Sequence, residues 1–203
     1  TGPTASKVAT PENKEITPAG IDMVIRLASK SVPSVGFRQV ITSFSGIRAS
    51  EANGDFIIRP GTGMANFVNV AAIDSPGLTC CVAIAKQVVG LLGELDVNPN
   101  FNGHRDDPHA FQRMTLEEQN AFIKENPAYG KIVCRCETVS EGEILAAIRN
   151  NPPARDLDGV KRRTRSGMGR CQGGFCGPYI LELLAKEQNI PMEQVTKCGG
   201  SSF

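Results

Sequence analysis

Four cysteines of this chain occur as two close pairs. Cys134 and Cys136 are one residue apart, 34 residues follow, and Cys171 and Cys176 enclose Gln-Gly-Gly-Phe. A C-x-C pair does not readily close a disulfide with itself, but it can place two sulfurs on one metal or on one edge of a cluster. Four thiolates suit either a [2Fe–2S] cluster or a zinc ion, although zinc pairs are commonly spaced C-x₂₋₄-C. The spacing therefore predicts a metal site, with two structural disulfides as the alternative, formed by Cys134, Cys136, Cys171 and Cys176.

The residues around the second pair favour a negatively charged group. Between Arg155 and Arg170 the sequence holds six basic and two acidic residues, a net charge of +4. An oxidised four-thiolate [2Fe–2S] cluster carries a charge of about −2, which nearby cations stabilise. Pro178 suits the first turn of a helix, so Cys176 is expected near the positive end of that helix. Glycines in the same stretch allow backbone N–H groups to approach sulfur: Gly167, Gly169, Gly173, Gly174 and Gly177.

These motifs resemble a known domain. Cys134-Arg-Cys-Glu137, followed by the stretch from Val160 to Cys176, resembles the bacterioferritin-associated-ferredoxin-like [2Fe–2S] domain. It is most similar to the version fused to FAD-dependent dehydrogenases of the anaerobic glycerol-3-phosphate dehydrogenase type. The second pair is C-x₄-C here, where the small free-standing ferredoxins have C-x₂-C. The resemblance implies that the four cysteines ligate iron and that the domain relays electrons from a flavin.

A second motif joins a strand to a helix. The apolar run from Phe67 to Ile73 predicts a strand buried on both faces. It leads through Asp74 into Ser75, a good N-cap, and Pro76, a good first helical residue. Such a helix start can bind an anion, or it can be a plain connection. The segment resembles the closing part of the FAD domain in the glycerol-3-phosphate dehydrogenase and L-2-hydroxyglutarate oxidase-like family. That resemblance implies contacts to flavin from Ser75, Pro76, Gly77, Leu78 and Thr79.

A substrate contact follows from the same resemblance. Ser43-Phe-Ser-Gly-Ile-Arg48 resembles the segment that returns from the family's substrate domain, so Arg48 is the candidate ligand for the substrate's anionic group. A surface salt bridge is the alternative role for Arg48. Glycerol-3-phosphate dehydrogenases usually carry a lysine in the turn that reads Ser-Pro-Gly-Leu-Thr here. Its absence favours a related 2-hydroxy acid over glycerol 3-phosphate.

The dinucleotide fingerprint G-x-G-x-x-G is missing. Gly61-Thr-Gly63 begins like it, but position 66 is Asn and a strand is expected to follow. We therefore expect the carboxyl-terminal portion of a larger FAD-dependent oxidoreductase, which lacks its N-terminal FAD-binding part and is inactive alone. Without that part an apolar sheet surface is exposed, which predicts self-association. Electrons are expected to pass to an acceptor protein or to a quinone-linked subunit.

Composition excludes several other classes. Among 203 residues, 22 Lys and Arg balance 21 Asp and Glu, which argues against a nucleic-acid binder. No apolar stretch reaches the roughly 18 residues of a transmembrane helix. Seven cysteines without a secretory leader indicate a reducing cytoplasm. We expect a cytoplasmic protein, either free or peripheral to the membrane through a partner.

These motifs need an α+β scaffold to position them. We expect a partial flavoprotein α+β domain with mainly antiparallel strands (1–93), a connector (94–130), and a small helical [2Fe–2S]-binding-like domain (131–203). Apolar periodicity, capping boxes and turn residues predict helices near 21–30, 78–92, 115–124, 140–148 and 179–186, and strands at 40–44, 56–59 and 67–73. The alternative function is a structural zinc or protein-interaction module with no redox role.

Overall fold

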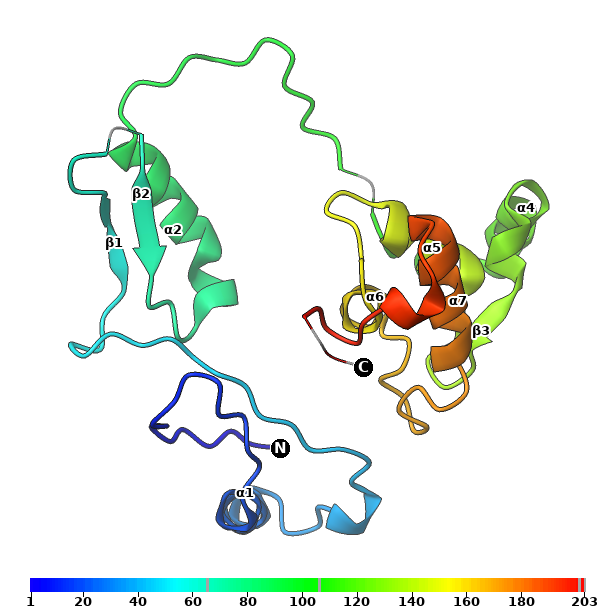
Figure 1. Cartoon of the computed structure of the whole chain (residues 1–203), viewed down its shortest axis with the longest axis horizontal. Coiled ribbons are helices and arrows are strands. Elements are labelled where there is room, and N and C mark those ends of the chain that lie inside the picture. The colour runs from blue at the N-terminus through cyan, green and yellow to red at the C-terminus, as the bar shows by residue number, and fades with distance from the viewer. Residues whose placement is uncertain (65, 106, 201, 203) are drawn as a thin grey trace. The chain divides into compact units, whose positions relative to one another are not determined.

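The computed structural model describes residues 1–64, 66–105, 107–200 and 202 (Figure 1). The chain divides into two compact units, Thr1–Asn102 and Gly103–Phe203, and each is described by itself. Helices dominate, and the described strands form two small antiparallel sheets of two strands each. The expected α+β class with antiparallel pairing is therefore present in this mostly helical form. Within the described residues no helix is both long and apolar enough to cross a membrane.

The first unit contains two helices and one hairpin. Helix α1 (Pro18–Ser31) begins where the Thr17 side chain accepts a 3.1 Å hydrogen bond from the Gly20 N–H. Strand β1 (Ile57–Pro60) pairs with β2 (Val68–Ala71), Ile57 lying opposite Ala71. Helix α2 (Gly77–Leu91) follows β2 and packs against β1. A short 3₁₀ turn, η1, spans Phe37–Gln39.

One predicted strand of this unit is wrong. Val40–Phe44, all of it described, has no regular secondary structure, and the Phe44 side chain is 90% exposed. The apolar run favours an extended chain, but a strand also needs a hydrogen-bonding neighbour. In the described residues β1 pairs with β2 instead.

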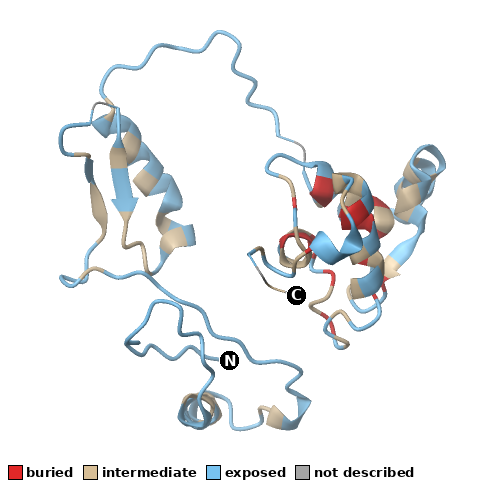
Figure 2. Cartoon of the chain, viewed as in Figure 1, coloured by how far each residue is buried: buried red, intermediate tan, exposed pale blue. Residues whose placement is uncertain are grey.

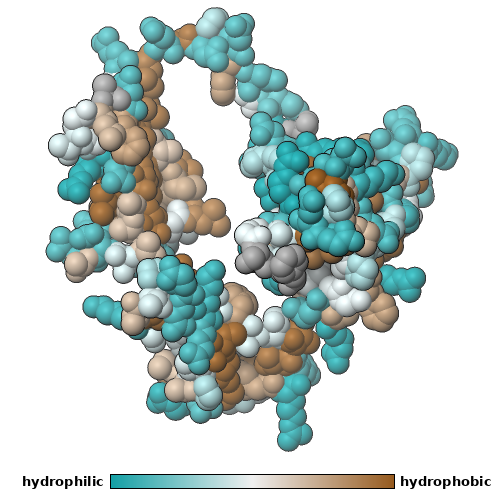
Figure 3. Space-filling model, in the orientation of Figure 1, coloured by the Kyte–Doolittle hydropathy of each residue, from teal (hydrophilic) through white to brown (hydrophobic). Residues whose placement is uncertain are grey.

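The first unit also exposes its apolar side chains. The prediction that strand 67–73 is buried on both faces is wrong, since Phe67 is 50% exposed and Val70 42%. None of the residues that the structure describes in this unit is buried (Figure 2). Figure 3 shows apolar surface gathered over β1, β2 and α2. These elements thus fold locally while their apolar faces stay uncovered.

The second unit carries the buried core. Its elements are α3 (Ala110–Arg113), α4 (Leu116–Glu125), η2 (Pro127–Gly130), β3 (Ile132–Cys134), β4 (Val139–Ser140), α5 (Glu141–Arg149), α6 (Leu157–Thr164), α7 (Gly177–Gln188) and η3 (Met192–Gln194). Helices α5, α6 and α7 pack together. Their apolar stripes meet in a core that includes Ile144, Ile148, Val160, Ile180 and Leu184.

Side chains cap these helices as the sequence patterns indicate. Thr115 and Glu118 form a capping box at α4, and Ser140 and Glu143 form one at α5, so both predicted boxes are confirmed. Helix α6 was not predicted. Its first turn is held by the Asp156 carboxylate, which accepts a 2.6 Å hydrogen bond from the Gly159 N–H.

The segment expected to be a connector is partly folded. Phe111, Phe122 and Tyr129 form an aromatic cluster with ring centroids 4.9–5.9 Å apart. Tyr129 packs so closely on Gly142 of α5 that a Cβ there would collide with its ring. The Gln112 amide donates a 2.6 Å hydrogen bond to Glu143. Residues 110–130 therefore belong to the second unit, because local helix formation and aromatic packing attach them to α5.

Candidate metal centre

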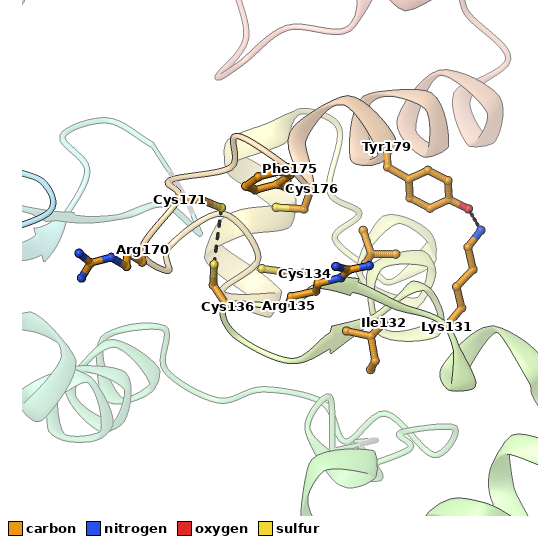
Figure 4. A pocket seen from close by; sticks show the side chains of 11 residues that line it. Lys131, Ile132, Cys134, Arg135, Cys136, Arg170, Cys171, Phe175, Cys176 and Tyr179 are labelled. Carbon is orange, nitrogen blue, oxygen red and sulfur yellow. Dashed lines mark hydrogen bonds between the residues drawn. The ribbon is translucent and has the colours of Figure 1, made fainter.

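The four paired cysteines line one cavity in the second unit. Cys134 ends β3, Cys136 lies in the turn to β4, Cys171 lies in the loop between α6 and α7, and Cys176 is the N-cap of α7. The cavity has a volume of about 760 Å³. Figure 4 shows the four sulfurs directed toward a common space. Residues 35 or more apart in sequence thus meet at one place.

One sulfur–sulfur contact joins a cysteine of the first pair to a cysteine of the second. The Cys136 thiol donates to the Cys171 sulfur, and the two Sγ atoms lie 3.6 Å apart. Cys134 and Cys176 are both buried, with 1% and 2% exposure. Within the described residues no three or more His, Cys, Asp or Glu side chains form a site for a single metal ion. The cysteines therefore approach one another across the two motifs.

The protein surroundings raise the pKa of one cavity thiol, Cys176, and lower the pKa of another, Cys171. The pKa of Cys176 is raised to about 11, first by burial and then by the neighbouring Cys134 and Cys171 thiols. The pKa of Cys171 is lowered, first by the backbone N–H of Phe175 and then by the Cys136 thiol and the Gly173 N–H. We expected this glycine-rich loop to bring backbone N–H groups close to a cysteine sulfur, and it does so at Cys171.

The loop needs its glycines for conformation and for close packing. Gly167 and Gly173 have φ angles of +84° and +88°, a region that side chains disfavour. A Cβ at Gly169 would collide with the Cβ of Cys136. The loop therefore lies directly on the turn that carries the first cysteine pair.

Only one of the predicted cations lies at the cavity. Of the six basic residues between 155 and 170, only Arg170 lines it. Arg165 instead forms a 2.8 Å ion pair with Glu137, which ties the end of α6 to the first cysteine turn. Arg163 donates to the Gly159 and Pro152 carbonyl oxygens. The net charge of a sequence window does not say which way its side chains point.

The sequence patterns did not indicate several of the lining residues. Lys131 forms a 2.8 Å ion pair with Glu141, and its ammonium also bonds the Tyr179 hydroxyl and lies 4.2 Å from that ring's centroid. The Tyr179 hydroxyl donates to Glu141 as well, and both contacts lower the pKa of Glu141. This triad joins the residue before β3 to α5 and α7. The remaining lining residues that were not predicted are Ile132, Val133, Arg135 and Phe175.

The flavin and substrate candidates lie in the first unit. Helix α2 begins at Gly77 with Pro76 as its N-cap, so the prediction that Ser75 caps it is wrong. The Ser75 N–H instead donates a 2.8 Å hydrogen bond to its neighbour Asp74. The Leu78 side chain is 91% exposed, and Pro76 and Thr79 are exposed beside it. Arg48 is exposed in a segment without regular secondary structure.

Comparison with known families matches both units. Residues 1–91 match the family described as FAD dependent oxidoreductase. Residues 132–186 match the BFD-like [2Fe-2S] binding domain. The second match spans all four paired cysteines and every element from β3 to most of α7.

Curated relatives carry related names. A glycerol 3-phosphate dehydrogenase of Caloramator mitchellensis is 39% identical over the whole of this chain, which covers 43% of that protein. An anaerobic glycerol-3-phosphate dehydrogenase subunit from Escherichia coli K12 is 43% identical over 32% of this chain and 12% of its own length. A glycerol 3-phosphate oxidase of Mycoplasma genitalium is 39% identical over 40% of this chain and 23% of its own length. The chain thus spans less than half the length of these relatives. No solved structure matches it significantly.

Proposed function

Because this chain joins an FAD dependent oxidoreductase region, residues 1–91, to a BFD-like [2Fe-2S] binding domain, residues 132–186, we propose that it serves electron transfer in a flavin-dependent dehydrogenase. The whole protein oxidises a small anionic hydroxy compound at a flavin. The cysteine site then passes electrons on to an acceptor protein or to a quinone-linked subunit.

The arrangement of the cysteines supports this role most directly. Two thiolates bound to one tetrahedral metal at about 2.3 Å lie about 3.8 Å apart, and the Cys136 and Cys171 sulfurs are 3.6 Å apart. The buried thiols of Cys134 and Cys176, again one from each motif, are also neighbours. The two motifs would therefore hold a [2Fe–2S] cluster between them, through Cys134, Cys136, Cys171 and Cys176. When bound, a [2Fe–2S] cluster accepts and releases one electron at a time.

The protein groups around these sulfurs prepare them for that role. The backbone N–H groups of residues 173–175 favour the thiolate form of Cys171. Burial of Cys134 and Cys176 excludes water from one side of the site. The Arg165–Glu137 ion pair fixes the turn between Cys136 and β4 relative to α6.

We assign the flavin and substrate contacts to the first unit. Ser75–Thr79 contact the flavin and Arg48 binds the substrate's anionic group, as the family resemblance implies. Glycerol 3-phosphate is the first candidate substrate, because relatives matched by this chain carry that compound in their names. A 2-hydroxy acid is the second, because the turn at 75–79 holds no lysine. We place the protein in the cytoplasm, free or peripheral to the membrane through a partner.

An assay with the 203-residue chain tests this proposal. The chain holds no G-x-G-x-x-G fingerprint and is expected to reduce no redox dye when supplied with glycerol 3-phosphate or a 2-hydroxy acid. After reduction with dithionite and removal of the excess, the same chain is expected to deliver one electron per molecule to the dye. Substrate-dependent turnover by the chain alone, or the lack of a reversible one-electron couple in an iron-loaded sample, would contradict the proposal.

A further inference from the structure

The mouth of the cysteine cavity exposes apolar side chains. Among the described residues of the second unit, the exposed large hydrophobic side chains are those of Leu116, Ile132, Phe175 and Met192. Two of these, Ile132 at 44% exposure and Phe175 at 89%, line the cavity. Phe175 lies between Cys171 and Cys176 (Figure 4). Apolar side chains exposed together at the rim of one cavity, an aromatic ring among them, are typical of a contact site.

The charged side chains at the mouth of the cysteine cavity are all positive. Lys131, Arg135 and Arg170 line the cavity, and no acidic residue among the described ones lines it with them. Lys131 is paired with Glu141. Arg135 and Arg170 are exposed and form no ion pair within the part of the chain that the structure describes. Figure 4 shows the Arg170 side chain pointing away from the four sulfurs.

We propose that Phe175, Ile132, Arg135 and Arg170, here called the Phe175 surface, form the docking site for an acidic electron-exchange protein. This inference rests on the proposed function for the electron transfer itself. An aromatic anchor flanked by arginines is the composition that dominates the binding energy of protein interfaces. Cations around the anchor attract and orient a partner that presents carboxylates.

The position of the surface suits such an exchange. Phe175 and Arg170 each adjoin a cysteine of the second pair in sequence, and Arg135 lies between the two cysteines of the first pair. A partner seated on these side chains is therefore close to the sulfurs. One electron leaves the reduced chain and one ferric haem or equivalent oxidised centre in the partner gains it. No bond or proton needs to be exchanged.

A matched pair of probe proteins tests the charge preference. Native cytochrome c is basic, whereas succinylated cytochrome c has the same haem and an acidic surface. The dithionite-reduced, iron-loaded chain is mixed with each ferric form, and haem reduction is followed by stopped flow. At low ionic strength we expect the succinylated form to react at least about tenfold faster, and this advantage to disappear at high salt because the charges are screened.

Variants assign the effect to the surface. Arg135→Gln and Arg170→Gln are each expected to lower the rate advantage of the succinylated form severalfold. Phe175→Ala is expected to slow the reaction with that form and to weaken its binding. Lys124→Gln removes an exposed cation on α4, away from the cavity, and is expected to leave the advantage unchanged. Calorimetric titration of the oxidised chain with succinylated cytochrome c gives a second readout that requires no electron transfer.

The outcomes separate this inference from the proposed function. If the chain takes up no iron and sulfide, the proposed function is contradicted before any cytochrome is added. A loaded chain that reduces both cytochromes equally, or prefers the native form, overturns the docking site and leaves electron relay intact. If the loaded chain forms dimers and Phe175→Asp abolishes them, the docking site is also overturned, because the Phe175 surface then binds a second copy of the chain.

Discussion

Gly169 lies against Cys136 with no room for a side chain between them. A Cβ at position 169 would collide with the Cys136 Cβ and come within 3.2 Å of the Glu137 Oε1. This contact presses the loop of the second cysteine pair onto the turn of the first. Between the same two segments the Cys136 and Cys171 sulfurs lie 3.6 Å apart.

Gly169→Ala is expected to disturb the metal centre. The added methyl group must push the two segments apart, which costs about 1–3 kcal/mol in a packed site. The iron content per chain should fall to less than half of the wild-type value. Gly177→Ala is the matched control, because nothing lies within 4 Å of a Cβ at Gly177 and its φ is negative. Equal iron content in both variants would show that the Gly169 contact does not matter.

Single cysteine replacements should distinguish the four cysteines that hold iron from Cys198, which does not. Serine at position 134, 136, 171 or 176 removes a thiolate that the cavity supplies, so each variant should lose most of its iron or bind it in a labile form. Cys198→Ser removes an exposed thiol outside the cavity and should retain the wild-type iron content. Iron and sulfide analysis measures this, and a cavity cysteine whose loss changes neither would be excluded as a ligand.

An ion pair on α5 and α7 predicts a dependence of stability on pH. Arg149 donates two hydrogen bonds of 2.6 and 2.7 Å to Glu187 and lowers the pKa of that carboxyl. The carboxylate form is therefore favoured in the folded state, so its stabilisation is present above the ordinary glutamate pKa of about 4.3. It is lost as the pH falls through the lowered pKa of the folded state.

Arg149→Met tests this pair. Arg149 is 62% exposed, so the variant should be less stable at pH 7 by only about 0.2–1 kcal/mol. Urea unfolding of both proteins across the acidic range should show this difference shrinking toward zero as Glu187 is protonated. A difference that stays constant with pH would assign the effect to packing rather than to charge.

The first unit is expected to associate with itself. None of its described residues is buried, and Leu78, Val82 and Val89 on α2 are 91%, 64% and 54% exposed. Contiguous apolar surface of this kind drives association in water. Sedimentation of the 203-residue chain should show concentration-dependent oligomers, and charged substitutions such as Leu78→Glu should reduce them. A monodisperse monomer at all concentrations would refute this prediction.

Local patterns in the sequence predicted local structure well. Both capping boxes, at Thr115 and Ser140, form as expected, since they depend on residues only three positions apart. Helix α6 was missed because its sequence, LDGVKRRT, is dominated by polar residues, and only the Asp156 cap indicates its start. The strand at 40–44 failed because strand pairing depends on a distant partner that a local pattern does not specify.

The candidate site was predictable only in part for the same reason. Spacing and residue type pointed to the four cysteines together. The Lys131–Tyr179 contact joins residues 48 positions apart, and the outward direction of Arg170 depends on the loop conformation. Side-chain direction in such a loop follows from its tertiary packing, as the Gly169–Cys136 contact illustrates.

The visible absorption spectrum of chain purified without oxygen, together with iron, sulfide and zinc analysis, decides whether the four cysteines hold a [2Fe–2S] cluster. We expect a brown sample with two irons and two sulfides per chain, and with broad bands near roughly 420 and 460 nm that bleach on addition of dithionite. A colourless sample with one zinc per chain would contradict this and would make the cysteine site structural.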